Sequence, residues 1–281
     1  MSQMGADNDK ICVGFICDNL RHLRITIMTL QTLIDALDLP DSTRVNQRVP
    51  KKLLVENGAP TVADKRRINE GIEEIQWVAS LKPNTVGVPV YVDEVREYLE
   101  IAVLTVTLRP EAKAGRLAEL IHRAIPYPLF LVLVQGDQTI LSLAHKRRAQ
   151  NEAEKFVLDD GVVDVVVSGD DPLSAGVKKQ FLDALALGSQ PRTNLMLLYQ
   201  GWIDTIVALQ ASRLNGSFVQ AASKDLAVER REAVLMCREL EAKIAVLRNT
   251  AAKEKQMARR VELNWEIKAL EFALAEALRC L

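Results

Sequence analysis

The sequence predicts an α+β fold, a mixed sheet with packed helices, followed by an all-α C-terminal region with an antiparallel coiled-coil hairpin. Two observations lead to this prediction. Apolar runs rich in branched residues, separated by turn signals, recur between residues 28 and 170, whereas the chain from 171 onward shows helical periodicity almost throughout. We expect an N-terminal extension over 1–27, a mixed α/β domain over 28–170 and a helical domain with a coiled-coil arm over 171–281.

The first clear amphipathic helix begins at Met28, where Thr29 is suited to cap it and Pro40 to stop it. Residues 1–27 show neither the helical nor the strand period convincingly. We therefore expect this extension to be disordered or a non-native start. The run ICVGFIC at 11–17 leaves open the alternative of an edge strand.

The stretch 48–83 is the most informative part of the sequence. We interpret KKLLVE as a strand that leads into a turn at Asn57-Gly58. Thr61 and Asp64 then form an acidic variant of the capping box, and apolar residues spaced by three and four predict one helix from there to Pro83. Cations in the first turn of that helix have the wrong sign for its dipole, which favours anions. This misplaced charge indicates an anion site, although solvated side chains balanced by nearby glutamates explain it equally well.

The remaining α/β elements follow from buried apolar runs and turn signals. We expect strands at 98–109, 128–134 and 139–144, a helix at 111–124, and a β-hairpin between 155 and 167 divided by Asp159-Asp160-Gly161. Basic residues follow two of these strands and indicate a second cationic rim. The residues predicted to bind an anion or a nucleic-acid backbone are Lys51, Lys52, Lys65, Arg66, Arg67, Arg109, Lys146 and Arg147.

The C-terminal third predicts a helix from Asp171-Pro172 to 187, a central packing helix at 195–214 closed by Asn215-Gly216, and two long amphipathic runs. Apolar residues in these runs alternate spacings of four and three, which indicates a heptad seam. A turn at Asn249-Thr250 closes them into a hairpin, unless they form one continuous helix. The residues predicted to bind a protein partner are Leu240, Ile244, Leu247, Ile267, Leu270 and Leu274.

Catalytic signatures are missing from the sequence: there is no phosphate loop, dinucleotide fingerprint, nucleophile elbow or zinc spacing. We predict no catalytic residue, no metal site and no cofactor. Acid–base catalysis through histidine would need His122 or His145. The competing hypothesis is a divergent metal-dependent nuclease that uses Asp93, Glu97 or Glu100 with Lys51 or Lys52.

Composition sets broader limits. A formal net charge of -1 argues against wholesale polyanion binding, while leaving room for local basic patches. The four cysteines show no metal-ligand spacing and are expected to be reduced thiols. No apolar run is long enough to cross a bilayer, and the N-terminus does not resemble a signal peptide. We therefore expect a cytoplasmic protein.

Several strings together carry a family resemblance: VPKKLLVE, ADKRRINEGIEEIQWVASLKPNTVGVP, REYLEIAVLTVTLR, ELIHRAIPYPLFLV and LSLAHKR. They resemble the uncharacterised bacterial family known as domain of unknown function 4391, over about residues 28–215, with the arm left open. The resemblance implies an accessory role, because members of that family tend to lie near helicases and DNA methyltransferases in restriction-like, antiphage loci.

The functional expectation combines these points. We expect an accessory, non-catalytic subunit of a DNA-targeting defence complex that binds a helicase or methyltransferase through the arm, with DNA contact open. The alternatives are the nuclease described above and a homodimeric structural protein joined through its coiled coil.

Overall fold

The computed structural model describes residues 28–149, 156–168 and 171–281, so the expectations for 1–27 lie outside the described residues. The chain divides into two compact units, Met1–Ile203 and Asp204–Leu281. This division falls inside helix α8 (Leu195–Asn215). The sequence-based boundary at residue 170 instead follows the change in composition. The two units are described separately below.

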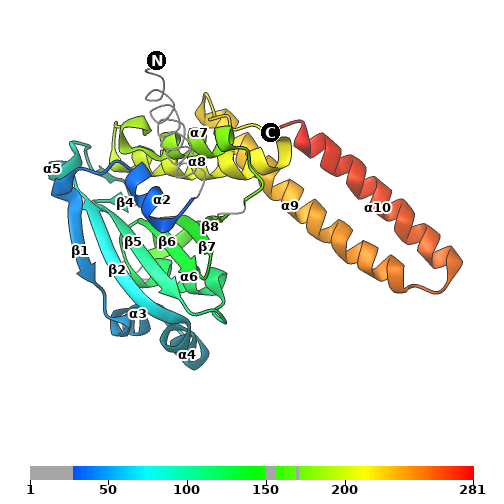
Figure 1. The fold of residues 1–281 in the computed structure, drawn as a ribbon, viewed down its shortest axis with the longest axis horizontal. Coiled ribbons are helices and arrows are strands. Elements are labelled where there is room, and N and C mark those ends of the chain that lie inside the picture. Colours follow the sequence, from blue (N-terminus) through cyan, green and yellow to red (C-terminus); the bar gives the residue numbers. More distant parts are fainter. Residues whose placement is uncertain (1–27, 150–155, 169–170) are drawn as a thin grey trace, which may run out of the picture. The chain divides into compact units, whose positions relative to one another are not determined.

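The first unit is built on a six-stranded mixed sheet (Figure 1). Among the neighbouring strands that the structure describes in this sheet, only β5 and β6 are parallel, and α6 (Ala114–Ala124) connects them. A parallel pair needs such a crossover, and its strands are buried on both faces. The predicted mixed sheet with packed helices is thus confirmed. Its strands, in spatial order, are β1 (Arg44–Arg48), β2 (Ile72–Leu81), β5 (Ile101–Leu108), β6 (Leu129–Gln135), β7 (Gln138–Arg148) and β8 (Phe156–Ser168).

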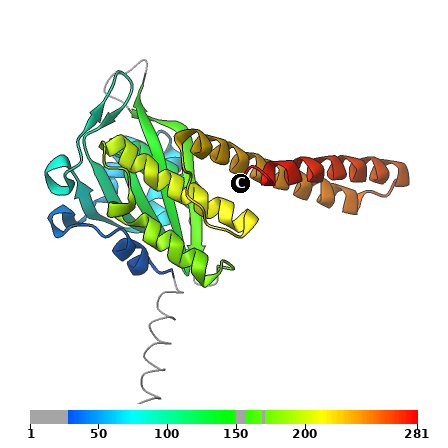
Figure 2. The same cartoon turned by 90° about the horizontal axis from the view of Figure 1, so that it is seen from above.

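Helices cover both faces of this sheet (Figures 1 and 2). On one face, α3 (Lys51–Gly58), α4 (Val62–Gly71) and α6 contribute to a core cluster with β2, β5 and β6. On the other face lie α7 (Ala175–Leu185) and the first part of α8. Here the Trp202 ring packs on Phe130, with 5.2 Å between ring centroids, and the indole N–H donates to the Leu185 carbonyl at 2.9 Å.

Smaller elements complete the unit. Thr29 caps α2 (Leu30–Ala36) as predicted, since its hydroxyl accepts from the Thr32 N–H at 3.2 Å. The others are two 3₁₀ turns (Asp41–Thr43 and Leu187–Ser189), α5 (Pro83–Val86) and a small hairpin of β3 (Tyr91–Val92) and β4 (Glu97–Tyr98).

Two predictions for the stretch 48–83 are wrong. KKLLVE forms helix α3, and the expected long helix ends at Gly71 and continues as strand β2. Ile72 and Ile75 both belong to the core cluster although they are three residues apart. This is because the pairing with β5 shifts register between Ile72 and Glu74, and a bulge changes which residues face the core. The bulge therefore produces a spacing that resembles a helix.

The predicted hairpin between 155 and 167 is also wrong, because β8 runs as one strand through Asp159-Asp160-Gly161. Its pairing with β7 jumps from Leu143↔Val163 to His145↔Asp159, and Gly161 has a φ of 81°. A left-handed glycine is expected at a bulge as well as at a turn. The same three residues therefore bend a strand instead of reversing it.

In the second unit, α9 (Lys224–Lys253) and α10 (Met257–Leu278) pack against each other through a cluster that includes Ile244, Ala251 and Ile267. Asn249 and Thr250 lie inside α9, so the predicted turn is wrong by a few residues, and the chain reverses at 254–256. The continuous-helix alternative is therefore excluded. Coiled-coil geometry in this pair stays a prediction.

Close packing of α3 on α6 generates a stability prediction. A Cβ atom on Gly58 would lie 2.5 Å from Ala124 Cβ and 2.7 Å from the Leu120 carbonyl oxygen. We expect Gly58→Ala to lower the free energy of unfolding by about 1–3 kcal/mol through overpacking. The matched control is Gly115→Ala in α6, where nothing lies within 4 Å. This control should leave the free energy unchanged or raise it by up to about 1 kcal/mol. Urea denaturation measures both, and equal effects would contradict the assigned packing.

Candidate anion-binding and partner-binding surfaces

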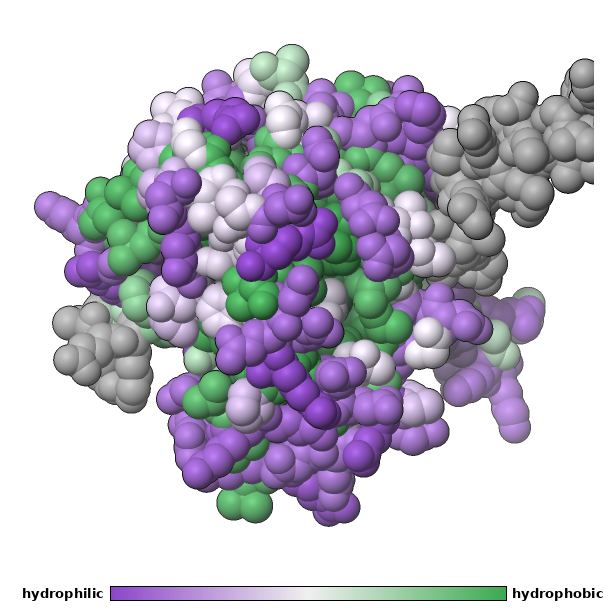
Figure 3. All heavy atoms as spheres, turned by 60° about the vertical axis from the view of Figure 1, so that its left-hand side comes forward, coloured by the Kyte–Doolittle hydropathy of each residue, from purple (hydrophilic) through white to green (hydrophobic). Residues whose placement is uncertain are grey.

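The surface over α3 and α4 is largely hydrophilic, as the lower part of Figure 3 shows. It is organised around a buried carboxylate, Asp64, in the first turn of α4. Arg116 of α6 donates to Asp64 at 2.9 and 3.1 Å, Arg67 donates at 3.0 Å, and the Thr61 hydroxyl donates at 2.8 Å while capping the helix. The hydrogen bonds from Arg116, then that from Thr61, lower the pKa of Asp64 from 3.8 to about 2. The carboxylate therefore stays charged and fixes α4 to α6.

Most of the cations predicted to bind an anion here are already partnered. Lys51 donates to the carbonyl oxygen of Ile72, and Lys52 lies 3.5 Å from Glu56. Arg66 pairs with Glu70 at 2.9 Å, and Arg67 with Asp64. Lys65 is the exception, since it is exposed and forms no ion pair with any residue that the structure describes. Local acids thus neutralise most of this surface.

The three remaining predicted cations do not form one rim. Arg109 follows β5, whereas Arg147 lies near the end of β7. Because β6 is parallel to β5 and antiparallel to β7, these two positions lie at opposite ends of the sheet. The prediction that the basic residues after these strands form a second cationic rim is therefore wrong.

Lys146 does not belong to a surface. It is only 3% exposed, and its ammonium donates to the carbonyl oxygens of Ile125 and Tyr127, just beyond the C-terminus of α6. Burial lowers its pKa, while carbonyl oxygens at a helix C-terminus favour the charged form. Lys146 thus satisfies backbone acceptors that the turn after α6 would otherwise leave without donors.

A polar network that the sequence did not predict surrounds the end of β7. Arg96 and Arg147 lie 2.5 and 3.6 Å from Asp159 of β8, and Arg148 lies 2.7 Å from Glu97 of β4. The pairs made by Arg96 and Arg148 fix the β3–β4 hairpin to the sheet, and the pair made by Arg147 joins β7 to β8. His145 bonds Tyr98 through Nδ1 and Gln200 Oε1 through Nε2, the latter at 2.7 Å. The run of cations Lys146, Arg147 and Arg148 at the end of β7 is the signal that the sequence offered, but the acidic partners of Arg147 and Arg148 are distant in sequence.

The groups required by the nuclease alternative do not converge. Lys51 contacts Ile72 at the start of β2, whereas Glu100 lies 3.3 Å from the Ser80 hydroxyl at the other end and pairs with Lys82 at 3.1 Å. Eight residues of strand separate these points by roughly 25 Å. In the described ranges, no group of three or more His, Cys, Asp or Glu residues is placed to hold a metal ion.

His122 is fully buried on α6, and its Nε2 lies 3.0 Å from the Ser142 hydroxyl of β7. Burial, with Lys146 nearby as a smaller cause, holds the pKa of His122 well below 6.5, so its ring is neutral. Its Nδ1 has no hydrogen-bond partner among the described residues. A neutral histidine enclosed in this way is placed for packing and not for exchange of protons with a substrate.

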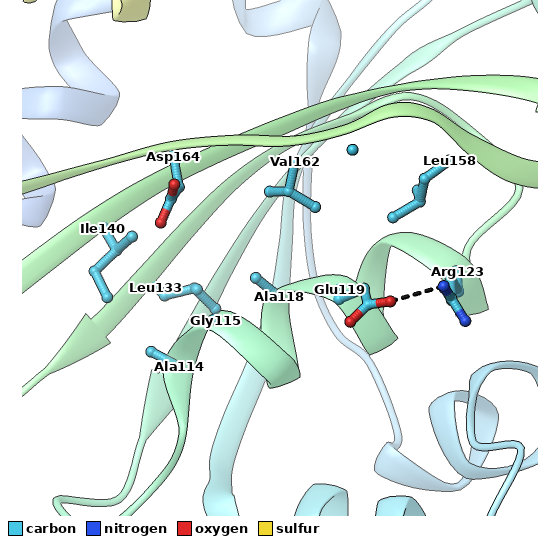
Figure 4. Close-up of a pocket in the computed structure, with 11 residues that line it drawn as sticks. Ala114, Gly115, Ala118, Glu119, Arg123, Leu133, Ile140, Leu158, Val162 and Asp164 are labelled. Atoms are coloured by element: carbon cyan, nitrogen blue, oxygen red, sulfur yellow. Dashed lines mark ion pairs between the residues drawn. The ribbon is translucent and has the colours of Figure 1, made fainter. Parts of the chain in front are cut away.

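A cavity of about 480 Å³ lies between α6 and β8 (Figure 4). Small residues on α6, such as Ala114 and Ala118, face Leu158 and Val162 of β8 across it. Glu119 and Arg123 pair at 2.7 Å at one end, and Asp164 lies at the other. The cavity is large enough for a small ligand, but its described lining presents no serine, threonine, cysteine, lysine or histidine, and its two carboxylates, Glu119 and Asp164, lie at opposite ends.

The residues predicted to bind a partner lie in or beside the contact between α9 and α10. Leu240, Ile244 and Ile267 are buried, and Leu247, Leu270 and Leu274 pack against the same cluster. An open groove of about 390 Å³ runs beside this contact. It is lined by Ala242, Lys243, Val246, Leu247, Glu266 and Leu270. Leu247 and Leu270 therefore reach a surface, and Val246, which is 64% exposed, was missed.

A family model described as Domain of unknown function (DUF4391) matches residues 37–274, most of the chain. The chain belongs to this family. The match includes most of the arm, whereas the sequence resemblance had left open whether the arm belongs to the family domain. Comparisons with curated proteins and with solved structures find no significant match. Within the described residues, no helix is both long and apolar enough to cross a membrane.

The Asp64 network generates a prediction about acid stability. Because the folded pKa of Asp64 is about 2 and its ordinary value is 3.8, the unfolded chain binds more protons between these values. The contribution of Asp64 to the free energy of unfolding is therefore fully present above about pH 4 and is lost as the pH falls towards about 2. Asp64→Asn should lower the melting temperature at neutral pH and flatten this acid dependence. Asp137→Asn, in the exposed β6–β7 turn, is the control and should melt as the wild type does at each pH. If the melting temperatures of the wild type and both variants changed with pH in the same way, the role of Asp64 would be contradicted.

Proposed function

We propose that this protein is a non-catalytic adaptor of a DNA-targeting antiphage defence complex, working in the cytoplasm and docking a helicase or DNA methyltransferase through its helical arm. One observation carries the proposal: the arm has an open, largely apolar groove although its two helices already bury a common seam. Grooves between two helices bind a third amphipathic helix by the packing that forms a coiled coil.

The chemistry of the groove fits a helical partner. Ala242, Val246 and Leu270 provide an apolar floor, and Lys243 and Glu266 place one charge of each sign on its borders. Such a rim of charges sets the register of a partner, while the apolar floor contributes most of the affinity. Antiphage association itself rests on the genomic neighbourhood that the family resemblance implies.

Direct DNA contact is a smaller part of the proposal. It rests on Lys65 and Arg109, which are exposed and make no ion pair with the described residues. Isolated cations of this kind contact phosphates without reading sequence. We therefore expect weak binding that depends strongly on salt.

The groove can be tested by identifying the neighbouring genes and co-expressing the protein with a helicase or DNA methyltransferase that they encode. Val246→Glu places a charge on the apolar floor without disturbing the buried seam, and we expect it to reduce co-purification by about tenfold or more. Asn249→Glu is a matched control, since it adds the same charge to the exposed surface of α9 outside the groove lining. Equal retention of the partner by both variants would rule out the groove as the docking site.

The DNA contact can be tested by measuring affinity for duplex DNA over a range of salt concentrations. Each lost phosphate contact reduces the slope of log K against log salt by about 0.9, so Lys65→Ala with Arg109→Ala should reduce it by about 1.8. Arg66→Ala is the control, because Glu70 already neutralises Arg66, and it should change the slope much less. An unchanged slope in the double variant would remove DNA from the proposal.

A further inference from the structure

Helix α10 carries a second apolar stripe on the face opposite its contact with α9. Val261, Trp265 and Phe272 are 49%, 70% and 69% exposed. Trp265 lies two residues from both Leu263 and Ile267 of the buried seam, about 200° around the helix. Exposed tryptophan and phenylalanine on one stripe are unusual for a solvated face, and such residues are enriched at the centres of protein interfaces.

The stripe has the spacing of a heptad repeat. Its positions alternate by three and four residues over five steps, which is the a/d pattern of two helices packed side by side. Near its middle, the Lys268 ammonium lies 5.7 Å from the centroid of the Trp265 ring. The six positions are Ala258, Val261, Trp265, Lys268, Phe272 and Ala275.

We infer that this stripe binds the same stripe of a second copy of the chain, with the two α10 helices antiparallel. When the sequence is paired with its own reverse, Ala258 faces Ala275, Val261 faces Phe272 and Trp265 faces Lys268. Because a two-fold axis relates the two copies, each of these three contacts occurs twice in the dimer. Small residues then meet at the ends, an aliphatic residue meets an aromatic one, and each ammonium meets the face of an indole.

Charge complementarity favours a second copy of the chain over other partners for this stripe. Against a wholly apolar helix Lys268 would be buried without a counterpart, whereas the second copy supplies the ring of Trp265. Helix α10 carries four acids (Glu262, Glu266, Glu271 and Glu276) and three cations (Arg259, Arg260 and Lys268), so it lacks the excess of positive charge that binding to an anionic lipid surface requires.

The self-association can be measured by light scattering of the full chain across the micromolar range. We expect the wild type to approach twice the mass of one chain, and Trp265→Ala with Phe272→Ala to remain at the mass of one chain. Both side chains are exposed, so circular dichroism should show an unchanged fold. A monomeric wild type would overturn the inference. Val246→Glu should still dimerise, which separates this surface from the groove of the proposed function.

The direction and register can be tested by cross-linking in a background with Cys12, Cys17 and Cys280 replaced by serine. Ala258→Cys and Ala275→Cys variants are prepared separately and mixed under oxidising conditions. The antiparallel register predicts a disulfide-linked dimer only in the mixture. A cross-linked dimer of Ala258→Cys alone would show parallel pairing and overturn the proposed arrangement, and the absence of any cross-link would do the same.

Discussion

The parallel pairing of β5 with β6 is the constraint on which the first unit depends. Two adjacent parallel strands require a crossover, and α6 provides it while packing its apolar side on the sheet. The carboxyl end of α6 then needs donors for its last carbonyl groups, and buried Lys146 reaches two carbonyl oxygens of the following turn. The same helix presents Arg116 to Asp64 and thereby fixes α4. One crossover thus determines the position of two charged groups that would be costly to bury alone.

The strand directions set by that crossover also decide which charged side chains lie close enough to bind one ligand. Since β5 and β6 share a direction that β7 reverses, Arg109 and Arg147 end at opposite edges of the sheet. Within α4, acids three or four residues away pair with Arg66 and Arg67. Cation density in the sequence therefore overstates the positive potential of the surface. The cations available to an anionic ligand are those with no acid within reach in the fold.

In the arm, the apolar residues that the sequence pattern marks most clearly are buried, and other residues form the exposed apolar surfaces. The apolar seam that the sequence spacing predicts is buried within the chain, where α9 and α10 pack against each other. Surfaces left for partners are the groove beside the seam and the outer stripe of α10, on which Trp265 and Phe272 are exposed. A two-helix arm with an apolar groove and a second apolar stripe is suited to joining proteins, which supports the proposed adaptor role.

The sequence by itself determined the mixed sheet, its helical C-terminal region and the caps at Thr29 and Thr61, because these depend on short-range periodicity and local hydrogen bonds. It also predicted two long amphipathic helices in the arm, but left open whether they form a hairpin or one continuous helix. Only the tertiary structure decided that 72–81 is a strand and that β8 continues through Gly161, since bulges change the apparent period. It likewise decided that Arg116 pairs with Asp64 and that Lys146 reaches the carbonyl oxygens of Ile125 and Tyr127. Those contacts join residues 19 to 52 positions apart, and no local pattern in a single sequence specifies which distant groups a fold brings together.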